Sequence, residues 1–252
     1  MNHRTALITG ASSGLGRGLA VWFAKRGVTV YAAARRVAML EALQREVGSA
    51  IIPLALDVAD ADATHARIAA LDQECGGLDL VIANAGTSDR QDTAKAEWPR
   101  THQVLKVNVT GAIATLSAAI PGMVQRGAGQ LVGISSLASL MAMPRSATYC
   151  ASKAFLNMWL EATRLDVERR GLSVTCIQPG FVKSELTQDF PSGSMPFLLE
   201  TEDAVERMGQ AILRKDAVFA FPWPTTALAH AGAALPRGVR AWAARRFRSK
   251  PL

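Results

Sequence analysis

The sequence predicts a single α/β domain built on a doubly wound, mostly parallel sheet of seven strands with helices on both faces. Short apolar runs of β type alternate with stretches of helical periodicity from one end of the chain to the other, as they do in βαβ units. A glycine-rich turn separates the first apolar run from the first helical stretch. The 252 residues, 49% hydrophobic and 19% charged, suit one well-buried globular domain rather than a disordered chain.

The same alternation locates the individual elements. We expect strands near residues 5–9, 28–34, 50–56, 78–83, 129–135, 172–178 and 217–221. We expect helices over 15–26, 37–47, 60–74, about 98–126, 148–170 and 201–214. The first helix carries apolar residues on one face, at Leu15, Leu19, Trp22 and Phe23. The least regular stretch, 183–200, has two prolines and a glycine, and we predict a mobile flap beside an active site.

The glycine-rich turn lies where the first strand meets the first helix, with the spacing G-x-x-x-G-x-G. Glycines permit a tight turn and a close approach of the backbone, and a helix N-terminus favours a pyrophosphate. An ordinary turn is the alternative, but its position after the first strand favours dinucleotide binding. The predicted contacts in this turn are Gly10, Ser12, Ser13, Gly14, Leu15 and Gly16.

The end of the second strand indicates which dinucleotide would bind. NAD-binding proteins usually place an acid here, where it holds the ribose hydroxyls and would repel a 2′-phosphate. This chain has Ala34 followed by Arg35 and Arg36, whose planar guanidinium groups suit a phosphate. We therefore predict NADP rather than NAD, with Arg35 as the principal contact. Two solvated arginines that open a helix are the alternative.

Tyr149 and Lys153 are four residues apart, a spacing that places both side chains on one face of a helix. An ammonium beside a phenol favours the phenolate and lowers the phenol pKa, so such a tyrosine can exchange a proton with an alcohol or ketone oxygen. Alone, the pair could also be an ordinary feature of the surface or core edge.

Further motifs follow in order along the chain. Asp57-Val58 follows the third strand, Asn84-Ala85-Gly86 the fourth, and Pro179-Gly180-Phe-Val182-Lys-Ser184 the sixth. With the turn and the Tyr–Lys pair, they resemble the short-chain dehydrogenase/reductase family, in particular its single-domain, Rossmann-type members of about 250 residues. The resemblance runs from about residue 4 to 221. It implies an adenine contact at Asp57-Val58, a sheet brace along the cofactor at Asn84-Ala85-Gly86, and nicotinamide contacts after the sixth strand, where Ser184 replaces the more usual Thr.

The resemblance also implies a catalytic set. Ser136, thirteen residues before Tyr149, stands at the position of the family's catalytic serine, and Asn108 matches its structural and proton-relay asparagine. Tyr149 would protonate the nascent alkoxide, Ser136 would orient the carbonyl oxygen, and Lys153 would lower the Tyr149 pKa and hold the nicotinamide ribose. Two positions depart from the family: Ser139 replaces a frequent Gly, and Ser13 replaces a residue that is basic in many NADP-preferring members.

These residues predict an NADPH-dependent reductase of ketones or aldehydes. Residues 137–146 and the flap would bound an apolar pocket, which favours an apolar, lipid-like or bulky carbonyl substrate. Its predicted lining is Leu137, Leu140, Met141, Met143, Phe181, Phe190, Met195, Phe197 and Leu198. The alternatives are an alcohol or hydroxysteroid-type dehydrogenase that runs oxidatively with NADP, and an NADP-binding protein without turnover. The intact set of Asn108, Ser136, Tyr149 and Lys153 argues against the last.

The basic charge of the chain is concentrated at its C-terminal end. Of 28 basic residues, six lie in 237–252, which contains none of the 21 acidic ones, so the remainder is nearly neutral. We divide the chain into a catalytic domain, 1–222, and a basic amphipathic extension, 223–252. The extension could rest on an anionic membrane surface or pack on protein. Prolines argue against a membrane span at 217–236, and no recognition motif suggests nucleic-acid binding.

The remaining expectations concern compartment, metals and assembly. Three cysteines without metal-ligand spacing, and no room for a signal peptide before the first strand, favour a reduced cytoplasmic protein. The four histidines form no metal-ligand cluster, so we predict no metal. The resemblance implies a homo-oligomer that pairs through the long helices near 98–126 and 148–170, and we favour a dimer.

Overall fold

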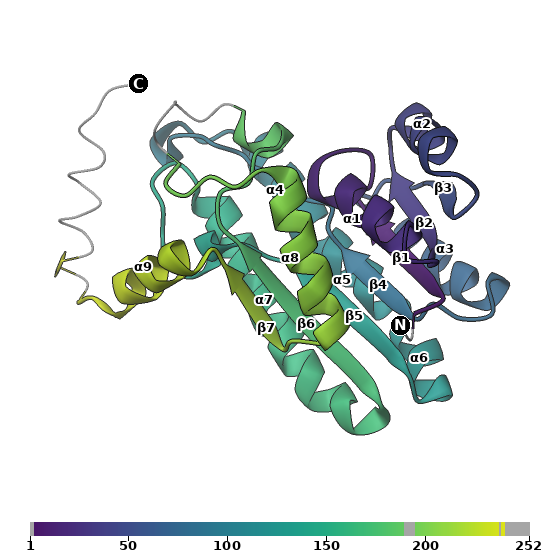
Figure 1. Cartoon of the computed structure of the whole chain (residues 1–252). Coiled ribbons are helices and arrows are strands. Elements are labelled where there is room, and N and C mark those ends of the chain that lie inside the picture. Colours follow the sequence, from purple (N-terminus) through teal and green to yellow (C-terminus); the bar gives the residue numbers. More distant parts are fainter. Residues whose placement is uncertain (1–2, 189–194, 237, 240–252) are drawn as a thin grey trace.

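A single parallel sheet forms the centre of the molecule (Figure 1). The structure is a computed structural model that describes residues 3–188, 195–236 and 238–239. Its seven strands lie in the order β3-β2-β1-β4-β5-β6-β7, and every pairing between neighbouring strands in this described part is parallel. The doubly wound α/β fold predicted from the sequence is confirmed.

The strands agree with the predicted runs to within a residue or two. They span Thr5–Thr9 (β1), Thr29–Ala34 (β2), Ile51–Ala55 (β3), Leu80–Ala83 (β4), Gly129–Ile134 (β5), Leu172–Pro179 (β6) and Val218–Phe221 (β7). The α-helices span Gly14–Ala24 (α1), Val37–Val47 (α2), Ala61–Glu74 (α3), Trp98–Leu105 (α4), Ala112–Ser117 (α5), Ile120–Arg126 (α6), Ala147–Val167 (α7), Thr201–Arg214 (α8) and Trp223–Ala234 (α9).

Two helical layers enclose the sheet, each over its own buried apolar cluster. On one face, α1, α2 and α8 pack on the strands, and the apolar side of α1 predicted from Leu19 and Phe23 is fully buried there. On the other face, α3, α5, α6 and α7 cover the strands, with Leu116 and Leu160 at their contact with the sheet. Burial on both faces explains why the strands read as continuous apolar runs rather than as alternating ones.

The helix predicted over about 98–126 is interrupted. Between α4 and α5 lies a π-helical segment, Lys106–Gly111, and α6 begins after a short turn with Pro121 in its first turn. Proline is tolerated there because the first amides of a helix have no partner within it. By length and composition alone, Trp98–Arg126 is the one described stretch that could cross a membrane. Its most apolar window is 56% buried in this fold, as in the core helix of a globular domain.

Helix α9 is absent from the sequence prediction, which took the prolines around it as helix breakers. The structure shows that these prolines lie at its ends. Pro222 precedes the helix, Pro224 lies in its first turn, and the helix ends at Ala234, before Pro236. Figure 1 shows α9 at the edge of the molecule, beyond β7. The basic end of the predicted amphipathic extension, 237–252, lies outside the described residues except for 238–239, and the proposed boundary at 222 stays a prediction.

Candidate active site

The carboxyl ends of the strands open into a cleft of about 910 Å³. Its walls carry the segments that follow β1, β2, β3, β4, β5 and β6. The strand order reverses direction between β1 and β4, and ligands of open α/β sheets bind at such a switch point. All predicted site residues except Gly16 and Asn108 line this cleft, and these two lie directly behind it.

The glycine turn approaches the strand next to it too closely for side chains. Gly10 has a φ of +68°, and a Cβ there would lie 2.8 Å from the Cα of Ala85. A Cβ on Gly16 would overlap both the carbonyl oxygen of Gly10 and the side chain of Asn84. The turn therefore leaves its backbone open to the cleft at the start of α1, which is the cradle that a pyrophosphate needs.

Asn84 fixes this turn to the end of β4. Its Nδ2 donates to the carbonyl oxygens of Thr9 at 3.0 Å and Gly10 at 3.3 Å, and its backbone N–H donates to the Thr9 hydroxyl. The bracing role expected of Asn84 is what the side chain performs. Asp57, expected beside the adenine, accepts from the backbone N–H of Ala59 at 3.1 Å and lines the cleft at the end of β3.

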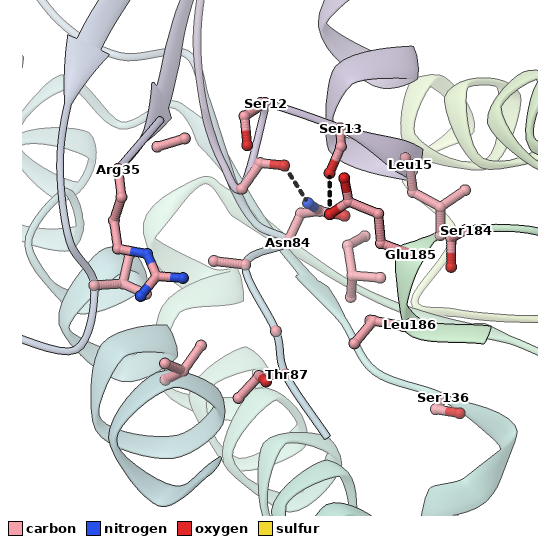
Figure 2. Close-up of a pocket in the computed structure, with 18 of the residues that line it drawn as sticks. Ser12, Ser13, Leu15, Arg35, Asn84, Thr87, Ser136, Ser184, Glu185 and Leu186 are labelled. Atoms are coloured by element: carbon pink, nitrogen blue, oxygen red, sulfur yellow. Dashed lines mark hydrogen bonds between the residues drawn. The ribbon is translucent and has the colours of Figure 1, made fainter. Parts of the chain in front are cut away.

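The two arginines after β2 have different surroundings. Arg35 projects into the cleft and stands across it from Ser13 and Glu185 (Figure 2). Arg36 turns toward the glycine turn, where its guanidinium donates to the hydroxyls of Ser12 and Ser13 and pairs with Glu185 at 3.0 Å. A cluster of hydrogen-bond donors thus surrounds the part of the cleft beside the start of α1.

Tyr149, Lys153 and Ser136 meet at the other end of the cleft. Tyr149 and Lys153 lie one turn apart near the start of α7, and the Lys153 Nζ is 5.8 Å from the centre of the phenol ring. Ser136 follows β5 and is within hydrogen-bonding range of the phenol. The three side chains that the sequence spacing grouped therefore lie on one wall of the cleft.

Burial raises the pKa of Tyr149, and the hydrogen bond from Ser136 opposes this shift. This direction differs from the expected lowering by Lys153. The reason is that the ammonium is aimed past the phenol: Lys153 Nζ donates to the carbonyl oxygen of Ile134 at 2.8 Å. Burial also lowers the pKa of Lys153 itself to about 8, because a charged ammonium is disfavoured away from water.

Asn108 lies in the π-helical segment and is 1% exposed. Its Oδ1 accepts from the Thr87 N–H at 2.8 Å, and its Nδ2 donates to the Thr87 carbonyl oxygen at 2.9 Å and to the Ser152 hydroxyl at 3.1 Å. The amide therefore joins the segment after β4 to α7, next to Lys153. Within the described residues this is a positioning role, since all three polar bonds of the side chain are made to protein groups.

Comparison with known proteins agrees with this geometry. Residues 4–194 match the family described as short chain dehydrogenase. The chain belongs to the short-chain dehydrogenase family. A Myxococcus xanthus protein named "uncharacterized oxidoreductase" is 53% identical over 98% of this chain and 99% of its own length. The protein is accordingly an oxidoreductase of this family.

Solved structures of short-chain dehydrogenases share the fold. One from Streptomyces avermitilis superposes with a TM-score of 0.82 at 22% identity, and the match covers 99% of both chains. Another, from Sphingobium yanoikuyae in complex with NADPH, gives a TM-score of 0.80 at 25% identity over 98% of both chains. The expected Rossmann-type single-domain architecture is thus confirmed, and the family binds NAD or NADP.

The cleft of this short-chain dehydrogenase fits such a cofactor. The cradle at Gly10 and Gly16 has no room for side chains, so backbone rather than side chains faces the cleft beside the N-terminus of α1. Hydroxyls and guanidinium groups at Ser12, Ser13 and Arg35 supply donors for phosphate oxygens. No group of three or more His, Cys, Asp or Glu side chains in the described part of the chain could hold a metal ion.

Ser139, whose departure from the family had no sequence-based interpretation, supports Ser136. Its hydroxyl donates to the Ser136 carbonyl oxygen at 2.5 Å and accepts from Asn157 Nδ2 at 2.7 Å. Asn157 lies on α7, so this bridge ties the peptide of Ser136 to the helix that carries Tyr149. No local pattern pointed to the bridge, because its partners are eighteen residues apart.

The apolar substrate pocket expected from residues 137–146 and the flap stays a prediction. Of the apolar residues named for it, none lines the cleft, and Phe190 lies outside the described part of the chain. Instead, α9 packs on residues 137–139, and Gly232 approaches the end of the Met141 side chain. The two ends of the flap are joined, since Lys183 N–H donates to Leu199 O and Leu199 N–H donates to Phe181 O, both at 3.0 Å.

Sequence reasoning missed some residues of the cleft. Glu185, Leu186 and Thr187 form a short 3₁₀ turn that lines it after Ser184, and Thr87, Gln103 and Lys106 line it from the side of α4. The available signal was Glu185 itself, an acidic residue directly after the predicted cofactor contact Ser184. Only the folded chain shows that Glu185 reaches Arg36.

Proposed function

We propose that the protein is an NADPH-dependent reductase that converts a ketone or aldehyde into an alcohol. One observation carries the proposal: Tyr149, Ser136 and Lys153 lie on the wall of the same cleft that the glycine turn and Arg35 open. A proton donor and a dinucleotide cradle in one cleft are what carbonyl reduction requires. The bound nicotinamide would supply the hydride, and the chain supplies orientation and the proton.

The residues divide this work by position. The Ser136 hydroxyl would hydrogen-bond the substrate oxygen, and the raised pKa of Tyr149 keeps its phenol protonated at neutral pH, ready to donate. Lys153, with a pKa of about 8, is mostly protonated at pH 7 and would replenish the phenol proton and hold the nicotinamide ribose. Asn108 and Ser139 would keep Lys153 and Ser136 in place through the bonds described above.

The preference for NADPH is supported by Ala34, Arg35 and Arg36. At the end of β2 these residues offer positive charge and no acid, and Arg35 faces the cleft. A 2′-phosphate would gain a charge-assisted contact there, whereas a ribose hydroxyl would find no carboxylate to accept from it. Because NADPH is the reduced pool in most cells, we propose reduction as the working direction and an apolar or bulky carbonyl compound as substrate.

The test replaces Tyr149 by Phe, which removes the proton and keeps the ring. We expect turnover of NADPH with a carbonyl substrate to fall about 10²- to 10⁴-fold, with the Kd of NADPH unchanged. The only other tyrosine, Tyr31, provides the matched control, since Tyr31→Phe lies on β2 and should keep full turnover. Near-normal turnover by Tyr149→Phe would overturn the assignment.

We further propose that the protein works as a cytoplasmic homodimer paired through α7 and the run α4–α6. An exposed apolar stripe on α7 supports this pairing. It consists of Phe155, Met158 and Leu165, which are 44%, 71% and 72% exposed. Large apolar side chains gathered on one helix face indicate an interface. Peripheral membrane contact through 237–252 remains part of the proposal, on the basic composition of that segment alone.

A further inference from the structure

The carboxylate of Glu185 occupies a set of donors at the glycine turn. Both of its oxygens are engaged by the Arg36 fork, Oε1 by Nη1 and Oε2 by Nη2, each at 3.0 Å. The Ser13 hydroxyl also donates to Oε2 at 3.0 Å, as drawn in Figure 2. The same Arg36 Nη2 donates to the hydroxyls of Ser13 at 2.7 Å and Ser12 at 3.0 Å, which completes the network.

This network lies in the cleft itself, beside the start of α1. Ser12, Ser13, Arg36 and Glu185 all line the cleft. The turn that carries Glu185 packs against the glycine turn, because a Cβ on Gly14 would lie 3.6 Å from the Cβ of Ser184. An internal anion is therefore held where a helix N-terminus, two hydroxyls and a guanidinium would otherwise attract the phosphate of a ligand.

A carboxylate and a phosphate cannot both use these donors. A serine hydroxyl has one proton to donate, and in the structure Ser13 gives it to Glu185. Two anions held by one guanidinium would also repel each other at short range. The hydrogen bonds from Arg36 and Ser13 hold the pKa of Glu185 below its ordinary value, so the carboxylate is charged at neutral pH. Arg35, by contrast, pairs with no carboxylate in the described part of the chain.

We propose that Glu185 is an internal competitor of the cofactor's phosphate groups and limits the affinity for NADPH by occupying Arg36 and Ser13. When the cofactor binds, its phosphate replaces the carboxylate, and the turn 185–187 at the beginning of the flap is released from the glycine turn. This inference deepens the proposed function and rests on it. It makes Glu185 a residue that sets cofactor affinity.

The competition should weaken the binding of NADPH more than that of NADH, and so reduce the preference of the wild-type protein for NADPH. NADPH carries an additional phosphate, and Arg36, the main donor to Glu185, directly follows Arg35, which is proposed to hold that phosphate. Removal of the carboxylate charge therefore frees more binding energy for NADPH than for NADH. The ratio of the two dissociation constants is the quantity that separates this idea from a general change in the cleft.

The experiment measures the Kd of NADPH and of NADH by calorimetric titration of the full chain and of Glu185→Gln, which keeps the shape and removes the charge. We expect NADPH to bind about tenfold more tightly to the variant and NADH to change by less. The matched control is Glu200→Gln. Glu200 pairs with Lys183 at 3.3 Å near the same flap but does not line the cleft, so its loss should leave both constants unchanged.

Three further outcomes are decisive. In an Arg36→Ala background the effect of Glu185→Gln should become smaller, because the pair between Glu185 and Arg36 is already lost. An undiminished effect would overturn the proposal. Unchanged NADPH binding by Glu185→Gln alone would also overturn it, and weaker binding would overturn it and identify Glu185 as a clamp on the bound cofactor. If the wild-type protein binds neither nucleotide, the proposed function itself fails. If the wild type binds NADPH and the variant binds it no more tightly, only the role of Glu185 fails.

Discussion

Lys153 is a buried base whose pKa lies well below its ordinary value, which makes its contribution to stability measurable. It is 5% exposed, and burial lowers its pKa from 10.5 to about 8. Below pH 8 the ammonium is charged in both the folded and the unfolded chain, and the folded state bears the full cost of burying it. Between pH 8 and 10.5 the folded state has lost the proton that the unfolded chain still holds, so stability rises with pH across this window.

The corresponding prediction compares the unliganded wild-type protein with Lys153→Met. The free energy of unfolding of the wild type should rise relative to that of the variant by about 3 kcal/mol between pH 7.5 and 10.5. Urea unfolding at a series of pH values measures both curves, and their difference removes the titration of every other group. Parallel curves over this range would show that Lys153 titrates at its ordinary pKa.

The two arginines mark where residue-level prediction ends. The sequence indicated a phosphate contact after β2 because two basic residues replace an acid there, and it favoured Arg35. The structure agrees that Arg35 faces the cleft, yet Arg36 carries the network of hydrogen bonds. Its partner Glu185 is 149 residues away in the chain. Tyr149 and Lys153 could be paired from local spacing alone, whereas a contact of this range depends on the closed fold.

At the scale of the elements, Gly111 limits how closely the π-helical segment approaches the loop that follows β3. A Cβ on this residue would overlap the backbone carbonyl oxygen of Val58, which is not the end of a flexible side chain and cannot move aside. We expect Gly111→Ala to destabilise the protein by about 3 kcal/mol, as overpacking in a core does. Because Val58 lines the cleft, the same change should weaken NADPH binding.

Gly232 in α9 should tolerate the replacement by alanine that Gly111 does not. Its Cβ would meet only the end of the Met141 side chain, at 3.4 Å. Since alanine favours a helix over glycine, Gly232→Ala should be neutral or stabilising by up to about 1 kcal/mol. Thermal unfolding of the two variants checks both signs. Equal effects would mean that the approach of Gly111 to Val58 is not tight.

The elements themselves were mostly predictable, for a physical reason. Strands buried on both faces are short and continuously apolar. Helices that pack by one face have apolar residues every three to four positions. Both patterns can be recognised in the local sequence. Helix α9 has no such pattern, because it is rich in alanine and Ala229 is its one buried residue. The interruption at Lys106–Gly111 also lacks a periodic signal, although Asn108, an unfavourable residue in a helix interior, lies within it.

At the scale of the whole molecule, the stripe on α7 predicts association. We expect the wild-type protein to elute as a dimer in size-exclusion chromatography with light scattering. Met158→Glu, at the centre of the stripe, should shift it toward the monomer, because a charge buried in an apolar interface has no partner. Met39→Glu is the control, since Met39 is exposed on α2, in the opposite helical layer. A dimer that survives Met158→Glu would locate the interface elsewhere.

The π-helical segment also determines which neighbours α4 and α5, the helices before and after it, can contact. Each residue of an α-helix advances by about 100° around the axis, and a π turn contains about one residue more than an α turn. The side chains beyond Lys106–Gly111 are therefore rotated relative to those before it. Through this angular offset, α4 can pack on α7 while α5 packs on α3, β4 and β5. One continuous helical run thus contacts two different sets of neighbours. The offset lies at Asn108, which joins the loop after β4 to α7, the helix that carries Tyr149.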